Sequence, residues 1–471
     1  MICDAPEVRG ATWGPDGAII FTRDALFAGL SRVRVEGGPV ETLTVPDPQK
    51  GELSHRWPQL LPGGKAVLFT IHMLSGRQDE GQIATLSLDS GERRIVLQGG
   101  TYGRYVPTGH LVYASGGTLF AAPFDLERLQ VTGPVVPVLG DVRMAYTGGG
   151  VGQLSFSAEG QLVYVGGYTW GLETSLVWVD RRGNVQPATT ERRAYNGVDL
   201  SPDGKSAVMD IYGPTTQDVW WLDLFRQTQT RLTFEKDSFC SIFSPDGRRV
   251  AFSSNRKGPF NLFVVPTTGG AAERLTTSAT AWQQPTGWSP DGRELLFSQN
   301  SAETRWDIWV VPLGGDRKPR PVLVTKFSEG GATFSPDGRL LSYASNESGR
   351  SEVYVQPYPG QDRKWQISTD GGLGAWWARN GRELFYLSHG RLMAVSVDAQ
   401  PEFRSGRPEV LSPGPFGEGG LFNPPGNNVT SDGQRFLMIL EGPESPPEIV
   451  YIPDWFEELK ARVPGGTGRW R

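Results

Sequence analysis

The strongest constraint on this sequence is a short motif that recurs along its whole length. Ser-Pro-Asp-Gly occurs four times in the 471 residues, ending at Gly204, Gly247, Gly292 and Gly338. Degenerate copies end at six further glycines, Gly17, Gly64, Gly109, Gly160, Gly381 and Gly433. Successive copies stand 43 to 52 residues apart. A repeat of this period is typical of solenoids, propellers and related arrays, in which each unit buries its apolar face against the next.

Each copy of the motif predicts a tight turn between two β-strands. Proline presets φ at the first turn position, aspartate accepts a hydrogen bond from its own backbone, and glycine tolerates positive φ. An apolar run follows the turn, as at residues 250–252, and a second run comes about ten residues later, as at 262–265. A third run, such as 273–276, closes the unit. Together with a short strand before the turn, each repeat therefore predicts four strands.

The apolar runs are continuous, which indicates strands that are covered on both faces. Four-stranded sheets packed face to face around an axis provide that cover, whereas the 3.6-residue apolar period of helical repeats is absent. The 61 glycines and 36 prolines also favour strands and turns over helical repeats, because both residues interrupt helices. We therefore predict an all-β fold, a β-propeller of four-stranded blades with about ten repeats and one short C-terminal helix.

The grouping of the repeats leaves two alternatives. The seven turns from Gly160 to Gly433 predict a seven-bladed ring over residues 131–453, with three N-terminal blades over 1–130 as an incomplete set. Alternatively, all repeats form one large ring. In the first arrangement residues 135–138 supply the missing outer strand of the last blade, and the glycine-rich residues 148–152 form a linker.

Residues 454–471 are predicted to form the C-terminal helix and a tail. Asp454 is the expected N-cap, and Glu457 stands three residues later, where it completes a capping box.

Composition excludes several classes of protein. A net charge of −5 offers no attraction to nucleic acid, and two cysteines, Cys3 and Cys240, exclude a disulfide scaffold. Residues 1–10 lack the basic and apolar segments of a signal peptide, and the apolar runs are too short to cross a bilayer. From these features we expect a soluble chain.

The turns, together with Arg-Leu-Thr at residues 231–233 and 274–276, resemble the TolB-like and WD40-like propeller repeats of bacterial proteins. Four segments are similar to the C-terminal region of bacterial transmembrane serine/threonine kinases: residues 54–59, 314–319, 352–357 and 455–460. This resemblance implies a sensor or interaction part that lies outside the cytoplasm, in the periplasm, in intact family members.

No catalytic motif is visible in the chain. The kinase lysine motif, the His-Arg-Asp loop and Asp-Phe-Gly are absent. The nearest match to the Gly-x-Ser-x-Gly element of prolyl-oligopeptidase-like peptidases, residues 287–291, lacks the second glycine and coincides with a repeat turn. We therefore expect a binding or sensor propeller without enzymatic activity. The alternatives are a freestanding TolB-like interaction scaffold and the accessory propeller of a peptidase.

No cofactor or metal site is predicted. The four histidines share no ligand spacing, and the turn aspartates are single carboxylates, whereas calcium takes six to eight oxygen ligands. The predicted site is instead an axial opening that binds a protein, a peptide or a small molecule. Six residues precede the first strands of their blades, where propeller loops converge: Arg56, Trp57, Tyr195, Phe239, Trp282 and Gln284.

Overall fold

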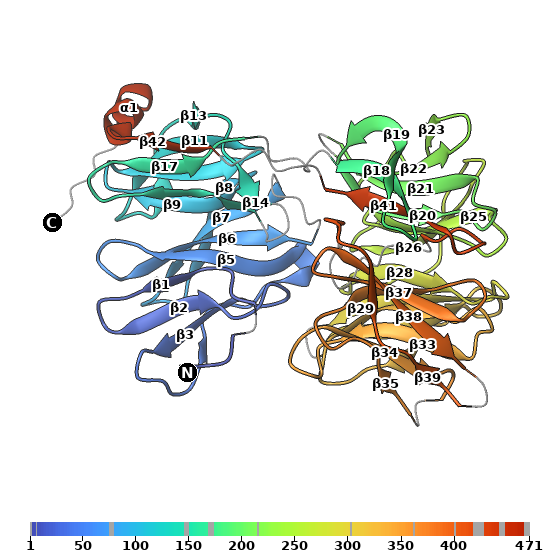
Figure 1. The fold of residues 1–471 in the computed structure, drawn as a ribbon. Coiled ribbons are helices and arrows are strands. Elements are labelled where there is room, and N and C mark those ends of the chain that lie inside the picture. Colours follow the sequence, from blue (N-terminus) through green and yellow to red (C-terminus); the bar gives the residue numbers. More distant parts are fainter. Residues whose placement is uncertain are drawn as a thin grey trace. The chain divides into compact units, whose positions relative to one another are not determined.

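The computed structural model describes all of the chain except residues 1, 6, 75–79, 146–149, 168–173, 214–215, 302–303, 361–362, 400–401, 418–427, 442–447 and 466–471. The chain forms two compact units (Figure 1). Unit 1 comprises Met1–Thr169 and Ser445–Arg471, and unit 2 comprises Trp170–Glu444. Both consist of antiparallel sheets, so the predicted all-β propeller fold is confirmed.

Unit 2 contains five sheets whose strands follow one another along the chain. Their strands are β20 (Tyr195–Leu200), β21 (Ser206–Tyr212), β22 (Gln217–Asp223) and β23 (Thr228–Arg231); β24 (Ser238–Phe243), β25 (Arg249–Ser254), β26 (Asn261–Pro266) and β27 (Glu273–Arg274); β28 (Gln283–Trp288), β29 (Glu294–Ser301), β30 (Arg305–Pro312) and β31 (Arg320–Leu323); β32 (Glu329–Phe334), β33 (Leu340–Ser345), β34 (Glu352–Pro357) and β35 (Trp365–Gln366); and β36 (Leu373–Trp377), β37 (Glu383–Ser388), β38 (Arg391–Asp398), β39 (Arg404–Ser405) and β40 (Glu409–Ser412).

A sixth sheet closes unit 2 into a ring. It joins β18 (Thr174–Asp180) and β19 (Val185–Arg193), from the start of the unit, to β41 (Arg435–Leu440), from its end. Buried apolar clusters link each of the six sheets to the next, and one of them packs β41 against the sheet of β36–β40. Unit 2 is therefore a closed six-bladed propeller.

Unit 1 contains four larger sheets and one short pair. They are β1 (Ala11–Trp13), β2 (Ala18–Thr22), β3 (Leu30–Arg34) and β4 (Glu41–Thr42); β5 (Glu52–Leu60), β6 (Ala66–Met73), β7 (Gln82–Ser87) and β8 (Arg93–Gln98); β9 (Thr101–Val106), β10 (His110–Ser115), β11 (Thr118–Asp125), β12 (Gln130–Val131) and β13 (Val136–Leu139); β16 (Leu154–Phe156), β17 (Leu162–Val165) and β42 (Ile449–Ile452); and the pair β14 (Met144–Ala145) and β15 (Val151–Gly152). A 3-10 turn, η1 (Pro48–Lys50), precedes β5.

The grouping of blades differs from the predicted one. The blade at Gly160 belongs to unit 1, because its strand β17 pairs with β42, which returns after all of unit 2. The ring of unit 2 thus has six blades rather than seven, and the expected boundary at 130/131 lies inside unit 1. The predicted clasp is also wrong, since β13 pairs with β11 of its own sheet. Of the expected linker 148–152, residues 148 and 149 lie outside the described residues, and β15 pairs with β14.

The single helix of the described residues, α1 (Trp455–Arg462), packs on unit 1 beside β13 (Figure 1). Trp455, Phe456 and Leu459 are buried in the cluster that joins the sheets of β9–β13 and β16–β42. The expected capping box does not form: Asp454 has φ −117° and ψ 37°, not the extended backbone that directs an N-cap side chain at the first turn. No helix in the described part of the chain is long and apolar enough to span a membrane.

The predicted turns are confirmed. All ten turn glycines have positive φ, between 68° and 101°. In the turn that ends at Gly204, Asp203 Oδ1 accepts hydrogen bonds from the Lys205 amide at 3.1 Å and from Ser201 Oγ at 2.7 Å. This network lowers the pKa of the Asp203 carboxyl, chiefly through the hydrogen bond from Ser201. The aspartates are therefore satisfied within their own turns.

Candidate ligand-binding site

The first strand of several sheets contains a β-bulge at which one residue has positive φ. In unit 2 these residues are Cys240, Gly331 and Gly374, with φ of 54°, 64° and 57°. In unit 1 they are Trp57 and Tyr102, with φ of 57° and 55°. Left-handed backbone costs an L-residue about 1–2 kcal/mol and costs glycine nothing. Strained bulges of this kind concentrate near functional sites, so two aromatic residues here point to unit 1.

Trp57 and Tyr102 contact each other across the neighbouring strands β5 and β9. Their ring centroids are 5.9 Å apart, with the planes at 75°. Arg104 lies beside both: its Nη1 donates to the carbonyl oxygens of Trp57 and Gly103, each at 2.9 Å, and its guanidinium stacks 3.9 Å from the Tyr102 ring centroid. Gly103 is required here, since a Cβ atom at this position would lie 2.7 Å from Ile83 Cγ2.

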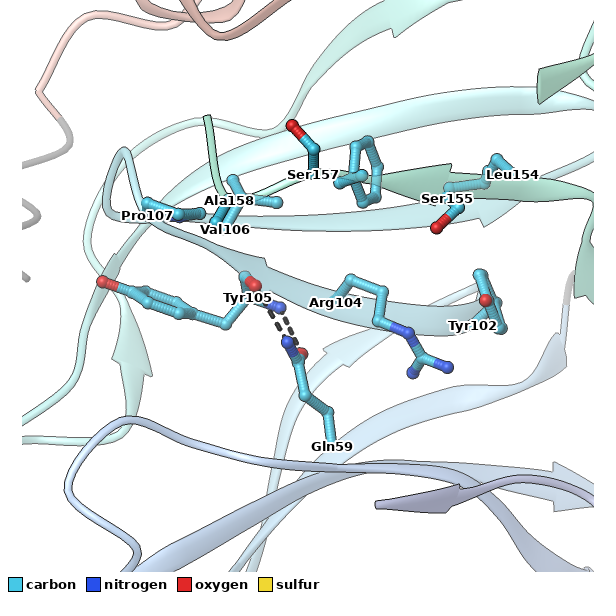
Figure 2. Close-up of a pocket in the computed structure, with 11 residues that line it drawn as sticks. Gln59, Tyr102, Arg104, Tyr105, Val106, Pro107, Leu154, Ser155, Ser157 and Ala158 are labelled. Atoms are coloured by element: carbon cyan, nitrogen blue, oxygen red, sulfur yellow. Dashed lines mark hydrogen bonds between the residues drawn. The ribbon is translucent and has the colours of Figure 1, made fainter. Parts of the chain in front are cut away.

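Arg104 and Tyr102 line a pocket of about 490 Å3 (Figure 2). The pocket spans the first strands of three sheets, β5, β9 and β16, and the turn that follows β16. Its lining residues are Gln59, Tyr102, Arg104, Tyr105, Val106, Pro107, Leu154, Ser155, Phe156, Ser157 and Ala158. A mostly apolar lining with a few polar groups is typical of sites that bind small molecules or peptide segments.

Two walls of this pocket are held rigidly. The Gln59 side chain pairs with the backbone of Tyr105, donating from Nε2 to its oxygen at 3.0 Å and accepting its amide at 2.7 Å (Figure 2). On the opposite wall, Phe156 stacks on Trp455 of α1, with centroids 5.0 Å apart and planes at 30°. The helix therefore packs against one of the residues that line the pocket.

The six residues predicted for one axial opening do not lie in one ring. Arg56 and Trp57 are in β5 of unit 1, whereas the other four predicted residues belong to unit 2. Those four are Tyr195 in β20, Phe239 in β24, Trp282 just before β28, and Gln284 in β28. The prediction assigned both groups to related positions of a single propeller, but the chain distributes its repeats over two units.

Within each unit, some of the predicted residues do meet. Trp57 adjoins the pocket through Tyr102 and Arg104. Arg56 is buried; its Nε donates to Ser54 Oγ at 2.7 Å, and burial, together with the charge of Arg9, lowers its pKa to about 9. In unit 2, Phe239 and Trp282 lie 6.0 Å apart in a cluster with Phe260. This cluster is part of the buried core.

Sequence analysis missed Tyr102 and Arg104, although a signal was present. Trp57 and Tyr102 each stand seven residues before a turn glycine, Gly64 and Gly109. The bulge residues Cys240, Gly331 and Gly374 have the same spacing from their own turns. Aligning the repeats on the turn glycine would therefore have placed both aromatic residues at one structural position.

A second group of polar residues in unit 1 resembles a catalytic relay but is inaccessible. Thr44 Oγ1 lies 2.7 Å from His55 Nδ1, and His55 Nε2 lies 3.1 Å from Glu52 Oε2. All three side chains are buried, and Thr44 Oγ1 also accepts the amide of Leu30 at 2.8 Å. Burial lowers the pKa of His55, so the imidazole is neutral and joins the strands of two sheets.

No protein-family model matches the chain. An uncharacterized protein of Agrobacterium fabrum is 26% identical over 207 residues, covering 42% of this chain and 67% of that protein. Tricorn protease homolog 1 of Streptomyces coelicolor is 38% identical over 80 residues, which are 17% of this chain and 8% of the relative. The Tol-Pal system protein TolB of Anaeromyxobacter dehalogenans is 26% identical over 118 residues, 25% of this chain and 26% of the relative.

Among solved structures, TolB from Agrobacterium tumefaciens superimposes with a TM-score of 0.49 and 20% identity, covering 57% of this chain and 99% of that one. In sequence, the chain is similar to a TolB protein over 118 residues, about a quarter of its length. It spans only 26% of the TolB relative and 8% of the tricorn homologue.

Proposed function

We propose that this chain is a non-catalytic binding propeller whose unit 1 pocket holds a short segment of polypeptide. The observation that carries the proposal is the pair Trp57 and Tyr102, which keep strained backbone at equivalent bulges and together hold Arg104 at the pocket. Backbone strain held at a bulge is often associated with side chains that the bulge directs toward a functional site.

The pocket lining supports binding rather than catalysis. It contains no histidine, cysteine, lysine or carboxylate, so its two serines, Ser155 and Ser157, have no general base among the lining residues. Ser157 Oγ accepts the amides of Glu159 and Gln161, each at 3.2 Å, which holds it in the turn. The remaining polar groups, on Gln59 and Arg104, are suited to recognition.

A polypeptide ligand fits the size and character of the pocket. About 490 Å3 is within the range of sites for ligands of a few residues, and the aromatic and aliphatic walls suit apolar side chains. The relatives are compatible with this: one is named as a protease homologue and another as a component of the Tol-Pal system.

In the sensing role that the sequence resemblance to kinase-linked regions implies, ligand binding outside the cytoplasm would be reported by a larger protein. A freestanding interaction scaffold is the alternative. An accessory propeller for a peptidase is the third candidate, and the protease homologue among the relatives favours it. The sensor, the scaffold and the accessory propeller would all use the same pocket, so one peptide-binding experiment tests what the three roles have in common.

The test is a screen of a random dodecapeptide library against the purified chain, followed by calorimetric titration of the selected peptides. We expect Tyr102→Ala and Trp57→Ala each to weaken binding at least tenfold. Tyr451→Ala is the matched control, since Tyr451 is an exposed aromatic residue of unit 1 outside the pocket. The proposal fails if no peptide binds, or if the pocket variants bind as well as the control.

A further inference from the structure

We infer that the pocket selects a peptide by one of its carboxylate groups, which Arg104 binds through its Nε and Nη2 edge. The inference rests on the proposed function and assigns the chemistry that the ligand must carry. It follows from the donors that Arg104 uses within the fold, from the charges around it, and from the way its guanidinium is held.

Arg104 uses only some of its hydrogen-bond donors within the fold. A guanidinium has five N–H groups in a rigid plane. The two on Nη1 are used by the carbonyl oxygens of Trp57 and Gly103. Beyond these carbonyls, the guanidinium has a hydrogen bond with the Tyr102 side chain, and Nε and Nη2 donate to no carbonyl or carboxylate oxygen of the described residues. These two nitrogens form one edge of the plane, which matches the two oxygens of a carboxylate in a bidentate pair.

The positive charge of Arg104 is not balanced by any neighbouring carboxylate that the structure describes. No carboxylate of the described residues forms an ion pair with Arg104, although the chain as a whole carries −5. The neighbouring first strands add further cations: Arg56 is buried in β5, and Arg9 accepts the Trp57 amide on its backbone oxygen at 2.7 Å. Glu7 lies 3.9 Å from Arg9, and Glu7 and Asp24 offset the charge on Arg56 in part. Arg104, which lines the pocket, has no such carboxylate acting on it.

The guanidinium of Arg104 is held in one orientation before a ligand binds. The Tyr102 ring covers one face of the guanidinium at 3.9 Å, and the two carbonyl bonds fix its rotation. A partly buried guanidinium is poorly hydrated, and burial lowers the pKa of Arg104. A carboxylate that enters the pocket therefore meets a donor edge that needs no reordering. The apolar wall of Leu154, Phe156 and Val106 would then accept a neighbouring side chain of the peptide.

The experiment begins with the wild-type chain and needs no variant. Each peptide selected by the screen is synthesised in three forms: with a free C-terminus, with a C-terminal amide, and with its aspartates and glutamates replaced by asparagine and glutamine. We expect one neutralised form to bind about tenfold more weakly, which identifies whether the carboxylate is terminal or from a side chain. Equal affinity of all three forms would overturn the inference.

A second arm changes the protein. Arg104→Gln should weaken binding of the acidic form about tenfold and leave the neutralised form unchanged, whereas Arg104→Lys should restore part of the loss. Arg128→Gln is the control, because Arg128 is an exposed cation in the turn between β11 and β12. Retention of the carboxylate preference by Arg104→Gln would overturn the inference. Peptides that bind without this preference leave the proposed function intact, whereas failure of every peptide removes both.

Discussion

Trp57 and Tyr102 occupy the same position in neighbouring sheets, seven residues before the turn glycine, and both adopt left-handed backbone while their rings meet at 5.9 Å. The first sheet has Gly10 at this position, with φ of 96°. A Cβ atom on Gly10 would lie 2.9 Å from Trp57 Cα, so glycine there makes room for Trp57. Three consecutive repeats thus share left-handed backbone at this position: Gly10 allows close packing, Trp57 contacts the Tyr102 ring, and Tyr102 stacks on the Arg104 guanidinium.

The strain at Tyr102 can be measured by removing it. Tyr102→Gly releases about 1–2 kcal/mol of left-handed strain and loses the contacts of a partly buried ring, so we expect the free energy of unfolding to change by less than about 1 kcal/mol. Peptide binding should nevertheless be lost. Urea denaturation and calorimetric titration measure the two effects separately.

The matched control for this variant is Tyr113→Gly in β10. Tyr113 is buried, stacks on Phe120 at 5.5 Å and lies outside the pocket lining. We expect Tyr113→Gly to lower the free energy of unfolding by about 3 kcal/mol or more, because the substitution creates a cavity and relieves no backbone strain. If Tyr102→Gly destabilised the chain as much, its backbone would not be strained in the way that we describe.

Closure of the unit 2 ring depends on Phe436 in β41. The side chain is fully buried and packs on Phe385 of the adjacent blade, with centroids 4.8 Å apart. Phe436→Ala should lower the free energy of unfolding by about 3–5 kcal/mol. Phe225→Ala, at a side chain that is 92% exposed, should change it by less than about 0.5 kcal/mol. Scanning calorimetry of the two variants checks this, and similar melting curves would count against ring closure through β41.

Helix α1 should matter for the pocket as well as for stability. Trp455→Ala removes the ring that stacks on Phe156. We therefore expect the free energy of unfolding to fall by about 3–5 kcal/mol and peptide binding to weaken. Lys460→Ala, on the exposed side of the same helix, should leave both quantities unchanged. Denaturation and titration of the folded fraction test the pair. Unchanged binding by Trp455→Ala would show that Phe156 keeps its place without the helix.

The stability of unit 2 should depend on pH through Glu329. Burial raises the pKa of this carboxyl from 4.5 to about 7, and the charges of Asp307 and Glu347 add to the effect while Lys364 opposes it. Thr325 Oγ1 donates to its Oε1, and Oε2 has no partner among the described residues. The carboxyl is therefore neutral in the folded chain at pH values where the unfolded chain ionises it.

A pKa that is raised on folding stabilises the protein fully below the unfolded value and loses that contribution as the pH rises through the folded value. We therefore expect the wild-type chain to lose stability relative to Glu329→Gln between pH 4.5 and about 7, by at most about 3 kcal/mol. Urea denaturation across this range measures the difference. Parallel stability curves for the two proteins would show that Glu329 ionises normally.

The sequence alone determined the local parts of this fold. The turn motif and the apolar runs between copies predicted the four-stranded repeats, because a turn depends on four adjacent residues and a buried strand on its own continuous apolar run. Each of these features is decided within about forty-five residues of chain.

The tertiary structure alone decided which repeats share a ring and which side chains meet in the pocket. β17 pairs with β42 and β18 with β41 across more than 250 residues, and no local signal marks those partners. Such pairs form only when packed blades bring two open edges together, which depends on the rotation between every successive sheet. The meeting of Trp57, Tyr102 and Arg104 likewise depends on how two blades pack, and not on either repeat alone.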